Sequence, residues 1–298
     1  MQILVIIITY NAMPWAERCL GSLMTSSIVP TILVIDNGST DGTPTFIIEK
    51  YPNVIFRQSG KNLGFGRANN LGLKYALEND FNYVYLLNQD AWVAPDTFEK
   101  LIKISTENPD YGLISPMQMN ADLYHIDKNF CYGLFDYKNK EVINDLYNGN
   151  LKNIYETTPF IMAAHWFMTQ ECIEKVGGFS PTFKHYGEDN NYAERVVFHG
   201  FKIGVAPLLR VVHDRSERVV QPSKEIFLNY IFFLVNLSSP YDTRIIVLLI
   251  KMIKNQIYNI IKHKSLKPIS YIFQIVLQLP TILKNRKISQ NIDCAFLC

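Results

Sequence analysis

Over about the first hundred residues, short apolar runs alternate with longer segments in which apolar positions recur every three or four residues. The short runs, at 3–9, 31–35, 54–57 and 83–87, have the length of buried strands. The longer segments, at 14–26, 43–51, 64–78 and 95–107, have the spacing of one helix face. One more strand is expected at 112–115. Because strand and helix alternate, the pattern predicts an α/β fold with a mostly parallel, Rossmann-like central sheet and helices on both faces.

The pattern weakens after residue 115. Residues 116–156 are rich in Tyr, Asn, Asp and Lys without a clear period, and we interpret them as a loop-rich insertion, with antiparallel strands as an open alternative. Short helices are expected at 171–176 and 190–199, each followed by glycine, and strands at 202–206 and 209–213. From residue 224 the period is helical again. We therefore predict a domain of residues 1–222, with halves at 1–115 and 116–222, and a helical region at 223–298.

Charge separates this helical region from the rest of the chain. The net charge is only +2, but residues 243–298 carry nine Lys or Arg against one acid, Asp293. Such a basic, amphipathic region either lies on an anionic membrane surface or packs against protein. No apolar run reaches the roughly 18 residues of a membrane-spanning helix. Five cysteines without metal-type spacing indicate a reducing compartment, so we expect a cytoplasmic protein, peripheral on the cytoplasmic face of the membrane.

Polar side chains follow three of the predicted strands. Because parallel strands end at one edge of a sheet, where open α/β sheets bind ligands, we expect a nucleotide there. A carboxylate such as Asp36 can accept a hydrogen bond from a base or a ribose hydroxyl, although a turn or helix cap is an equally open explanation. The candidate residues are Thr9, Tyr10, Asn11, Asp36, Asn37, Asn88, Gln89 and Asp90.

The stretch "GFGRAN", residues 64–69, superficially resembles the G-x-G-x-x-G phosphate loop. However, six residues separate its first glycine from the preceding strand, and Asn69 stands in place of the third glycine. We interpret the glycines instead as positions where the backbone approaches a base or a diphosphate, with Arg67 supplying charge. Gly64, Phe65 and Arg67 are therefore candidate nucleotide-binding residues.

Five stretches occur in order: "ITYNAMPWAERCLGSL", "ILVIDNGSTDGT", "NLGFGRANNLGL", "YLLNQDAWVAPDTFEKL" and "GGFSPTFKHYGEDNNYAERVVFHGFKIGVAP". As a set they resemble the inverting family-two glycosyltransferases, particularly the rhamnosyltransferase-like branch, over roughly residues 1–215. The resemblance implies a GT-A fold, a nucleotide-diphosphate sugar donor and a saccharide or lipid-linked glycan as acceptor. It suggests dTDP-rhamnose first and a UDP-hexose second, with no nucleic acid as partner. Residues 1–115 would then bind the donor and 116–222 the acceptor.

In that family the fourth strand ends in a D-x-D metal motif, and here the motif reads Asn88-Gln89-Asp90. Asp90 matches the position that ligates a divalent cation, Mn²⁺ or Mg²⁺, and Asn88 can still bind ribose or diphosphate. His213, in "RVVHDRS", resembles the second metal ligand of the family. The alternative for His213 is an ordinary histidine at a strand end.

The family resemblance also implies catalytic residues. Gly187-Glu188-Asp189 resembles the general-base motif, in which Asp189 takes the proton of the acceptor hydroxyl, with Glu188 as the second candidate. The chain has Asn191 and Ser180 where the family often has acids. Arg195 matches a frequent Arg that contacts diphosphate or forms a salt bridge in a helix. Trp166 either stacks on an acceptor sugar or belongs to the core.

Two other functions stay open. A sugar nucleotidyltransferase would carry a glycine-rich, basic loop after its first strand, where this chain has "TYNAMPWAE". A non-catalytic nucleotide-sugar or glycan-binding protein at the membrane is the other alternative, because Asn88 and Asn191 replace acids.

Overall fold

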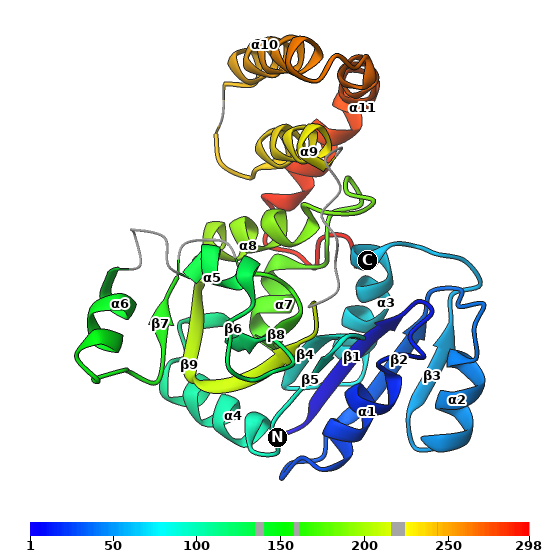
Figure 1. Cartoon of the computed structure of the whole chain (residues 1–298), viewed down its shortest axis with the longest axis vertical. Helices are drawn as coiled ribbons and strands as arrows, with labels where there is room; N and C mark the ends of the chain where they lie inside the picture. Colours follow the sequence, from blue (N-terminus) through cyan, green and yellow to red (C-terminus); the bar gives the residue numbers. More distant parts are fainter. Residues whose placement is uncertain (135–139, 158–160, 216–223, 243, 298) are drawn as a thin grey trace.

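The computed structural model describes residues 1–134, 140–157, 161–215, 224–242 and 244–297 (Figure 1). They form a nine-stranded sheet in the order β3-β2-β1-β4-β8-β6-β9-β5, with β7 paired to β9 beside this path. The strands are β1 (Ile3–Thr9), β2 (Thr31–Asp36), β3 (Ile55–Gln58), β4 (Tyr83–Asn88), β5 (Ala91–Trp92), β6 (Tyr111–Met119), β7 (Tyr155–Glu156), β8 (His165–Thr169) and β9 (Lys202–His213).

Helices cover both faces of the sheet, as expected. One core joins it to α3, α7 and α8, and a second joins it to α1, α2 and α4. Along β1 the side chains alternate between these cores, Leu4 and Ile6 entering the first and Val5 and Ile7 the second. The helices are α1 (Ala16–Met24), α2 (Thr43–Lys50), α3 (Phe65–Glu78), α4 (Thr97–Glu107), α5 (Lys128–Leu134), α6 (Lys140–Tyr147), α7 (Gln170–Val176), α8 (Glu188–Phe198), α9 (Lys224–Ser238), α10 (Ile245–His263) and α11 (Lys267–Ser289).

The first four strands bring the predicted polar ends together. β3, β2, β1 and β4 are parallel, with Thr9 opposite Asp36 and Ile8 opposite Asn88. Beyond β4 the sheet is mixed, because β8 runs antiparallel to both β4 and β6. The sequence pattern missed β8, since this short strand is buried on both faces and has no polar alternation. The two strands expected at 202–213 are one strand, β9, whose pairing with β6 shifts register between Pro116 and Met117.

The prediction of a loop-rich insertion at residues 116–156 was wrong for two segments, which form the helices α5 and α6. Asp127 caps the first of them, because its Oδ1 accepts hydrogen bonds of 2.9 Å from the backbone N–H groups of Asn129 and Phe130. Phe130 and Leu134 then pack into the sheet core. This short helix is stabilised by the burial of its apolar side chains. Its apolar pattern is too short for the sequence alone to predict a helix. The antiparallel alternative holds for β7, which pairs with β9.

The tail folds as three helices that stand above α8 (Figure 1). Their inner faces form a third hydrophobic cluster, which Phe183 of the preceding domain joins. The chain end then returns to the first core, where Leu297 is buried and the Gly178 N–H donates to the Ala295 carbonyl at 2.7 Å. None of the helices in these described ranges combines the length and the hydropathy that crossing a bilayer requires.

Candidate active site

The carboxylate of Asp36 lies at the shared end of β1 and β2 and is buried. Its Oδ1 accepts hydrogen bonds from the Thr9 and Ser39 hydroxyls, and its Oδ2 accepts from the backbone N–H groups of Gly38 and Ser39 at 3.2 and 3.0 Å. Each oxygen thus has two donors from this chain. Asp36 therefore orders the loop at 36–39, which is the cap role that the sequence left open.

Neighbouring polar side chains also hold the loops at this edge. Gln89 bonds the backbone of Tyr10 twice, through its Oε1 at 2.7 Å and its Nε2 at 3.2 Å. Asn11 has a left-handed backbone, and its Oδ1 accepts from the Thr40 N–H at 2.8 Å. Asn37 is buried, and its Oδ1 accepts from the Leu63 N–H at 3.0 Å. The Tyr10 side chain is exposed at the edge.

The pairing of β5 with β9 brings Asp90 beside His213, because Ala91 lies directly opposite His213. Asp90 Oδ1 lies 3.6 Å from His213 Nε2, and the Asn88 amide nitrogen lies 3.5 Å from the same atom. Arg215 donates its Nε–H to His213 Nε2 at 3.2 Å, so this nitrogen carries the lone pair. The proton is thereby assigned to Nδ1, which lies 3.9 Å from Asp127 Oδ2.

This arrangement fits a divalent cation. A carboxylate oxygen and an imidazole lone pair face one another, and the Asp127 carboxylate lies behind the histidine, 3.9 Å from Nδ1 and beyond hydrogen-bond distance. Among the described residues no group of three or more His, Cys, Asp or Glu side chains is arranged as a metal site. The protein would therefore supply Asp90 and His213, and donor phosphates and water would complete the coordination.

The predicted acidic pair begins α8. Gly187 precedes it with a left-handed backbone, at φ 89°. Burial, reinforced by the charge of Asp189, raises the pKa of Glu188 to about 7. Burial also raises the pKa of Asp189 to about 6, against the opposing effects of the Asn190 N–H and the Arg215 charge. Within the described structure, Glu188 Oε2 is buried and has no hydrogen-bond partner. Carboxyl groups held near neutrality in this way are typical of proton-transfer sites.

A cavity of about 480 Å³ unites these parts of the site, and its volume is typical of small-molecule sites. Asn88 at the end of β4, the pair Glu188–Asp189 and Arg215 all line it. Arg215 also contacts His213, so the cavity adjoins the Asp90–His213 pair. The structure therefore brings the β4 end, the acidic pair and the histidine together, whereas Asp36 ends β2, two strands away from β4, and does not line this cavity.

Two candidate acceptor residues lie elsewhere. Trp166 is fully buried, stacks on Phe179 at 6.0 Å between ring centroids, and donates its indole N–H to the Ile161 carbonyl at 3.1 Å. Arg195 is also fully buried, and its guanidinium donates to the carbonyls of Val176 and Gly178. Neither side chain reaches a surface where a sugar or a diphosphate can bind. Both are core residues, which corrects the acceptor-binding prediction.

The glycines of "GFGRAN" allow close packing with the loop and side chains opposite them. A Cβ on Gly64 would lie 2.5 Å from the Lys184 carbonyl oxygen, and a Cβ on Gly66 2.9 Å from the Phe179 Cβ. The expected approach of this backbone to a nucleotide stays a prediction. Phe65 does line the 480 Å³ cavity, whereas Arg67 lines a different cavity and donates to the Pro181 carbonyl at 3.4 Å.

Sequence reasoning missed three residues of this region. Arg215 follows His213 by two positions in "RVVHDRS", so the sequence placed the two residues close together but did not predict their hydrogen bond. Asp127 lies in the insertion, where no spacing links it to His213. His165 is buried beside the site, and its Nδ1 accepts from the Tyr85 hydroxyl at 2.8 Å. Burial lowers the pKa of His165 to about 3, so it is a neutral core histidine.

The fold is a mixed α/β sheet whose strand ends adjoin a cavity with two carboxyl groups. The family model "Glycosyl transferase family 2" matches residues 4–177, which is more than half of the chain. The chain belongs to glycosyltransferase family 2.

Its relatives include two rhamnosyltransferases. The N-acetylglucosaminyl-diphospho-decaprenol L-rhamnosyltransferase of Mycobacterium tuberculosis is 32% identical over 127 residues, which are 40% of this chain and 41% of that enzyme. The chain thus matches about two fifths of that relative's length. The O-antigen chain rhamnosyltransferase RfbN of Salmonella typhimurium is 26% identical over 223 residues, which are 72% of this chain and 67% of RfbN.

Solved structures share the fold. Staphylococcus aureus TarS 1–349 superposes with a TM-score of 0.62 at 16% identity, covering 98% of this chain and 83% of that one. The mannosyltransferase PcManGT of Pyrobaculum calidifontis, in complex with GDP-Man and Mn²⁺, gives a TM-score of 0.55 at 19% identity, covering 97% and 73%. These likenesses confirm the expected GT-A fold.

Proposed function

We propose that this chain is an inverting, metal-dependent glycosyltransferase that moves a sugar from a nucleotide-diphosphate sugar to a hydroxyl of a growing glycan or lipid-linked acceptor. The observation that carries the proposal is the 480 Å³ cavity, in which the pair Glu188–Asp189 faces the end of β4. The two rhamnosyltransferase relatives favour dTDP-rhamnose as donor, with a UDP-hexose as the alternative.

In this proposal the donor lies along the ends of β1, β2 and β4. The loop that Asp36 orders supports the nucleoside, and Asn88 and Arg215 face the diphosphate. Asp189 accepts the proton of the acceptor hydroxyl, whose oxygen attacks the anomeric carbon from the face opposite the leaving group. The bond from that carbon to the diphosphate oxygen breaks, and its electron pair leaves with the nucleoside diphosphate. The sugar is transferred with inverted configuration, and the proton remains on Asp189.

Asp90 and His213 would hold the cation of the proposed enzyme. When bound, a divalent ion neutralises the charge that develops on the leaving diphosphate. Asp127 lies behind the imidazole, with its Oδ2 3.9 Å from Nδ1, and the Arg215 guanidinium lies beside Nε2. In this proposal Arg215 also directs positive charge toward the diphosphate.

A screen of nucleotide sugars tests the proposal. We expect dTDP-rhamnose or a UDP-hexose to raise the melting temperature more with Mn²⁺ than without it, and slow metal-dependent release of nucleoside diphosphate to follow. Release of nucleoside diphosphate, without net synthesis of a sugar nucleotide, would show that the protein is not a nucleotidyltransferase. Binding with no release under any acceptor condition would instead indicate the non-catalytic sugar-binding protein.

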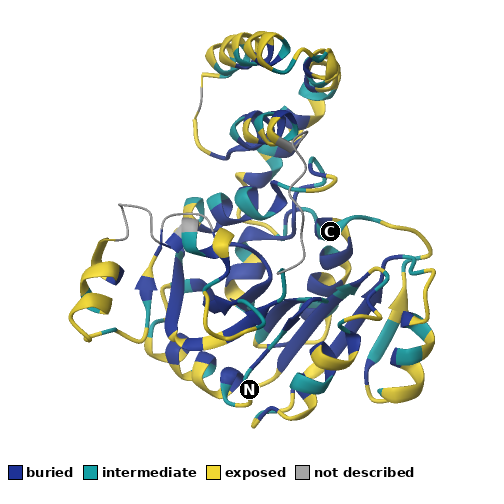
Figure 2. Cartoon of the chain, in the orientation of Figure 1, coloured by how far each residue is buried: buried dark blue, intermediate teal, exposed yellow. Residues whose placement is uncertain are grey.

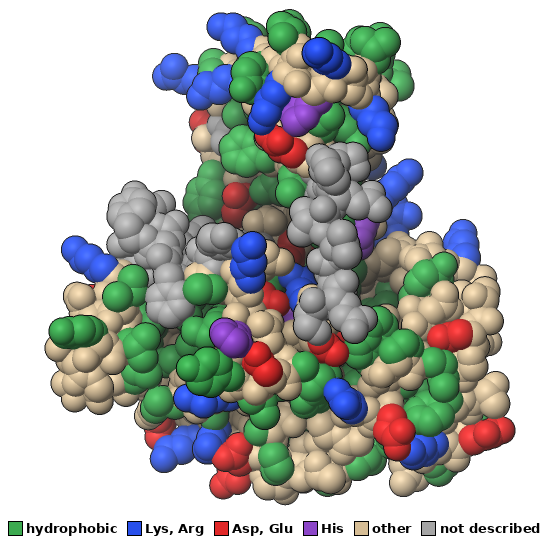
Figure 3. All heavy atoms as spheres, in the orientation of Figure 1, with side chains coloured by type: hydrophobic (Ala, Val, Ile, Leu, Met, Phe, Trp, Pro, Cys, Tyr) green, Lys and Arg blue, Asp and Glu red, His purple; other side chains and the backbone are tan. Residues whose placement is uncertain are grey.

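The outer helices of the tail support a membrane surface as a further partner. One stripe of α10 is apolar and between 42% and 74% exposed, whereas Gln256 and Asn259 on its inner face are buried. The residues of this stripe are Ile246, Ile250, Ile253, Ile257 and Ile261. Leu248, Leu249 and Met252 pack into the third hydrophobic cluster, so α10 presents apolar residues on both its inner and its outer side. Figure 2 shows its outer side exposed, and Figure 3 shows Lys and Arg side chains beside hydrophobic ones at this end of the molecule.

An anionic bilayer matches both the apolar stripe and the basic excess of the tail. Replacing Ile250→Gln and Ile257→Gln together should release the protein from vesicles of phosphatidylglycerol in co-sedimentation. The matched control is Ile48→Gln with Leu71→Gln, two similarly exposed apolar residues of the catalytic domain. Unchanged sedimentation of the α10 variant, or a change from dimer to monomer without any vesicle binding, would reject the membrane in favour of a protein partner.

A further inference from the structure

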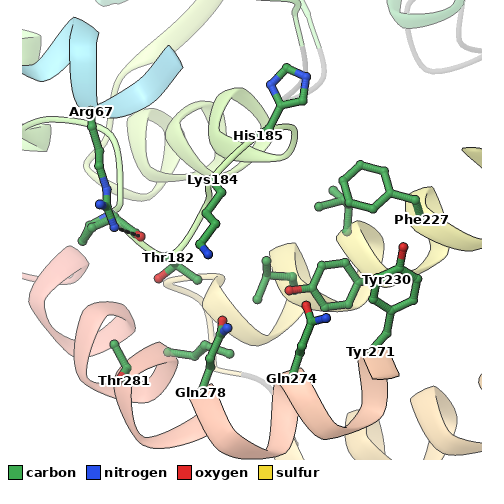
Figure 4. Close-up of a pocket in the computed structure, with 14 residues that line it drawn as sticks. Arg67, Thr182, Lys184, His185, Phe227, Tyr230, Tyr271, Gln274, Gln278 and Thr281 are labelled. Carbon is green, nitrogen blue, oxygen red and sulfur yellow. Dashed lines mark hydrogen bonds between the residues drawn. The ribbon is translucent and has the colours of Figure 1, made fainter. Parts of the chain in front are cut away.

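A second cavity of about 380 Å³ lies between the catalytic domain and the tail. Figure 4 shows its two walls. One wall is the loop at 181–185 with Arg67 of α3, and the other consists of α9 and α11. Gln274, Gln278 and Thr281 rise from successive turns of α11 into the space, opposite Lys184.

The catalytic-domain wall is positively charged. Arg67 and Lys184 line the cavity, and no carboxylate appears among its described lining residues. Lys184 forms no ion pair with any residue that the structure describes, and the printed contact of the Arg67 guanidinium is the Pro181 carbonyl at 3.4 Å. Two cations that share a cavity without a counter-charge attract an anion, and arginine in particular matches a phosphate group.

The tail wall is suited to a polyhydroxylated ring. Phe227, Tyr230 and Tyr271 form an aromatic surface, on which the two tyrosine rings stack at 4.7 Å. The side-chain amides of Gln274 and Gln278 have no hydrogen-bond partner among the described residues, and together they offer donors and acceptors to hydroxyl groups. An apolar wall with a few convergent polar groups is the usual composition of a small-molecule site.

The position of this cavity connects it to the proposed active site. His185 and Ile231 belong to the walls of both cavities, and the loop that carries Lys184 continues directly into Gly187-Glu188-Asp189. The loop is fixed at the pocket, because the Thr182 hydroxyl accepts from the Asn285 amide of α11 at 3.0 Å. A molecule in the second cavity can therefore extend a hydroxyl past His185 toward Asp189.

We propose that this second cavity binds the acceptor, and that the acceptor is a saccharide attached to a phosphate or diphosphate. Arg67 and Lys184 bind the phosphate, and the aromatic surface and the glutamines of α11 bind the sugar. This inference rests on the glycosyltransferase function proposed above, because it assigns that function's acceptor class. The tail then serves two purposes, closing the acceptor site and presenting α10 to the membrane.

The test is calorimetric titration of the full chain with N-acetylglucosamine 1-phosphate. The wild type should bind this probe saturably, and Arg67→Gln with Lys184→Gln should weaken binding about tenfold or more, since two charge-assisted contacts are lost. The matched control is Lys284→Gln with Lys287→Gln, which removes the same charge from exposed positions of α11 outside the cavity. Affinity in the control should change less than about twofold.

Further arms separate the saccharide from a bare anion and the acceptor from the donor. Gln274→Ala with Gln278→Ala should weaken binding of the sugar phosphate but leave that of inorganic phosphate unchanged. Uridine diphosphate should not displace the probe. Three outcomes would each overturn the assignment. The α11 control could lose as much affinity for the probe as the Arg67→Gln with Lys184→Gln variant. Inorganic phosphate could bind as tightly as the probe, or uridine diphosphate could displace the probe. Metal-dependent donor hydrolysis by the Lys284→Gln with Lys287→Gln control should stay at the wild-type rate, and its absence in both proteins would count against the transferase function instead.

Discussion

Carboxylates differ in hydrogen bonding between two regions of the molecule. One region is the edge formed by the ends of β1, β2 and β4, which we call the donor edge because the proposal places the sugar donor there, and the other is the acidic pair Glu188–Asp189. Both oxygens of Asp36 accept two hydrogen bonds from the surrounding loop, so its charge is stabilised before any ligand arrives. Glu188 instead keeps an oxygen buried without a partner, and burial raises the pKa values of both Glu188 and Asp189. A satisfied carboxylate orders a binding loop, whereas an unsatisfied one near neutrality is suited to moving a proton.

The two regions also differ in what supports them. The donor edge is built within the first hundred residues by parallel pairing of β1, β2 and β4. The acidic pair lies next to the tail, because a Cβ on Gly187 would lie 2.9 Å from Ile231 and 3.0 Å from Val235, both in α9. The tail therefore packs against the proposed proton-transfer site.

The largest effect is expected at Asp189. Asp189→Asn keeps the shape of the side chain but removes the base, so transfer should fall about 10²- to 10⁴-fold. Donor affinity, measured by calorimetry with a nucleoside diphosphate, should stay within about twofold because the donor edge is untouched. Glu188→Gln is the paired control and should retain most of the activity. A greater loss in Glu188→Gln than in Asp189→Asn would assign the base to Glu188.

Asp36→Ala should have the second largest effect. It should weaken donor binding and lower the stability of the folded protein. It leaves the N–H groups of Gly38 and Ser39 and the Thr9 hydroxyl without their acceptor, at about 1–3 kcal/mol for each buried group that stays unpaired. We expect about 4 kcal/mol of lost stability in urea unfolding and weaker donor binding. Asp110→Ala, which removes an exposed partner of Lys202, should cost less than about 1 kcal/mol.

Gly187→Ala tests the support that α9 gives to the acidic pair. Gly187 and Gly200 share a left-handed backbone at φ 89°, but an alanine methyl at Gly200 meets nothing within 4 Å. Gly200→Ala should therefore cost only the backbone strain, about 1 kcal/mol, and Gly187→Ala about 3 kcal/mol with reduced transfer. Equal costs in thermal unfolding would show that α9 does not press on the loop.

The two regions should also differ in the pH dependence of stability. Glu188 and Asp189 titrate at higher pH in the folded protein than in the unfolded chain, so between about pH 4 and 7 the folded state binds more protons. Their contribution to stability is greatest below pH 4 and is lost as the pH rises to 7. Glu188→Gln should flatten this slope in urea unfolding from pH 4 to 7. An unchanged slope would mean that Glu188 titrates normally.

The sequence was sufficient to predict the part of the site in which local apolar patterns and parallel strand pairing alone decide where residues lie. The strands ending at Thr9, Asp36 and Asn88 have clear lengths, and parallel pairing alone places their ends together. It was insufficient where a neighbour distant in sequence decides the outcome. Trp166 was a candidate surface for stacking on a sugar, but Phe179 and Tyr192 surround it in the core, and the close contact of Gly64 with the Lys184 carbonyl was equally hidden.

Tertiary contacts also decided the remaining differences. No spacing in the chain connects Asp127 to His213 or brings Leu297 into the first core. The exposed apolar stripe of α10 was equally hidden, because a helical period does not show which side of the helix the protein covers.

The most direct test of the contrast between the two regions is a comparison of kcat and KM for the wild type, Asp36→Ala and Asp189→Asn with one nucleotide sugar and Mn²⁺. The account predicts a crossed result, in which Asp36→Ala raises the KM for the donor with a modest change in kcat. Asp189→Asn should lower kcat and leave that KM almost unchanged. The same change in both constants for the two variants would contradict the division of the site into a binding edge and a proton-transferring pair.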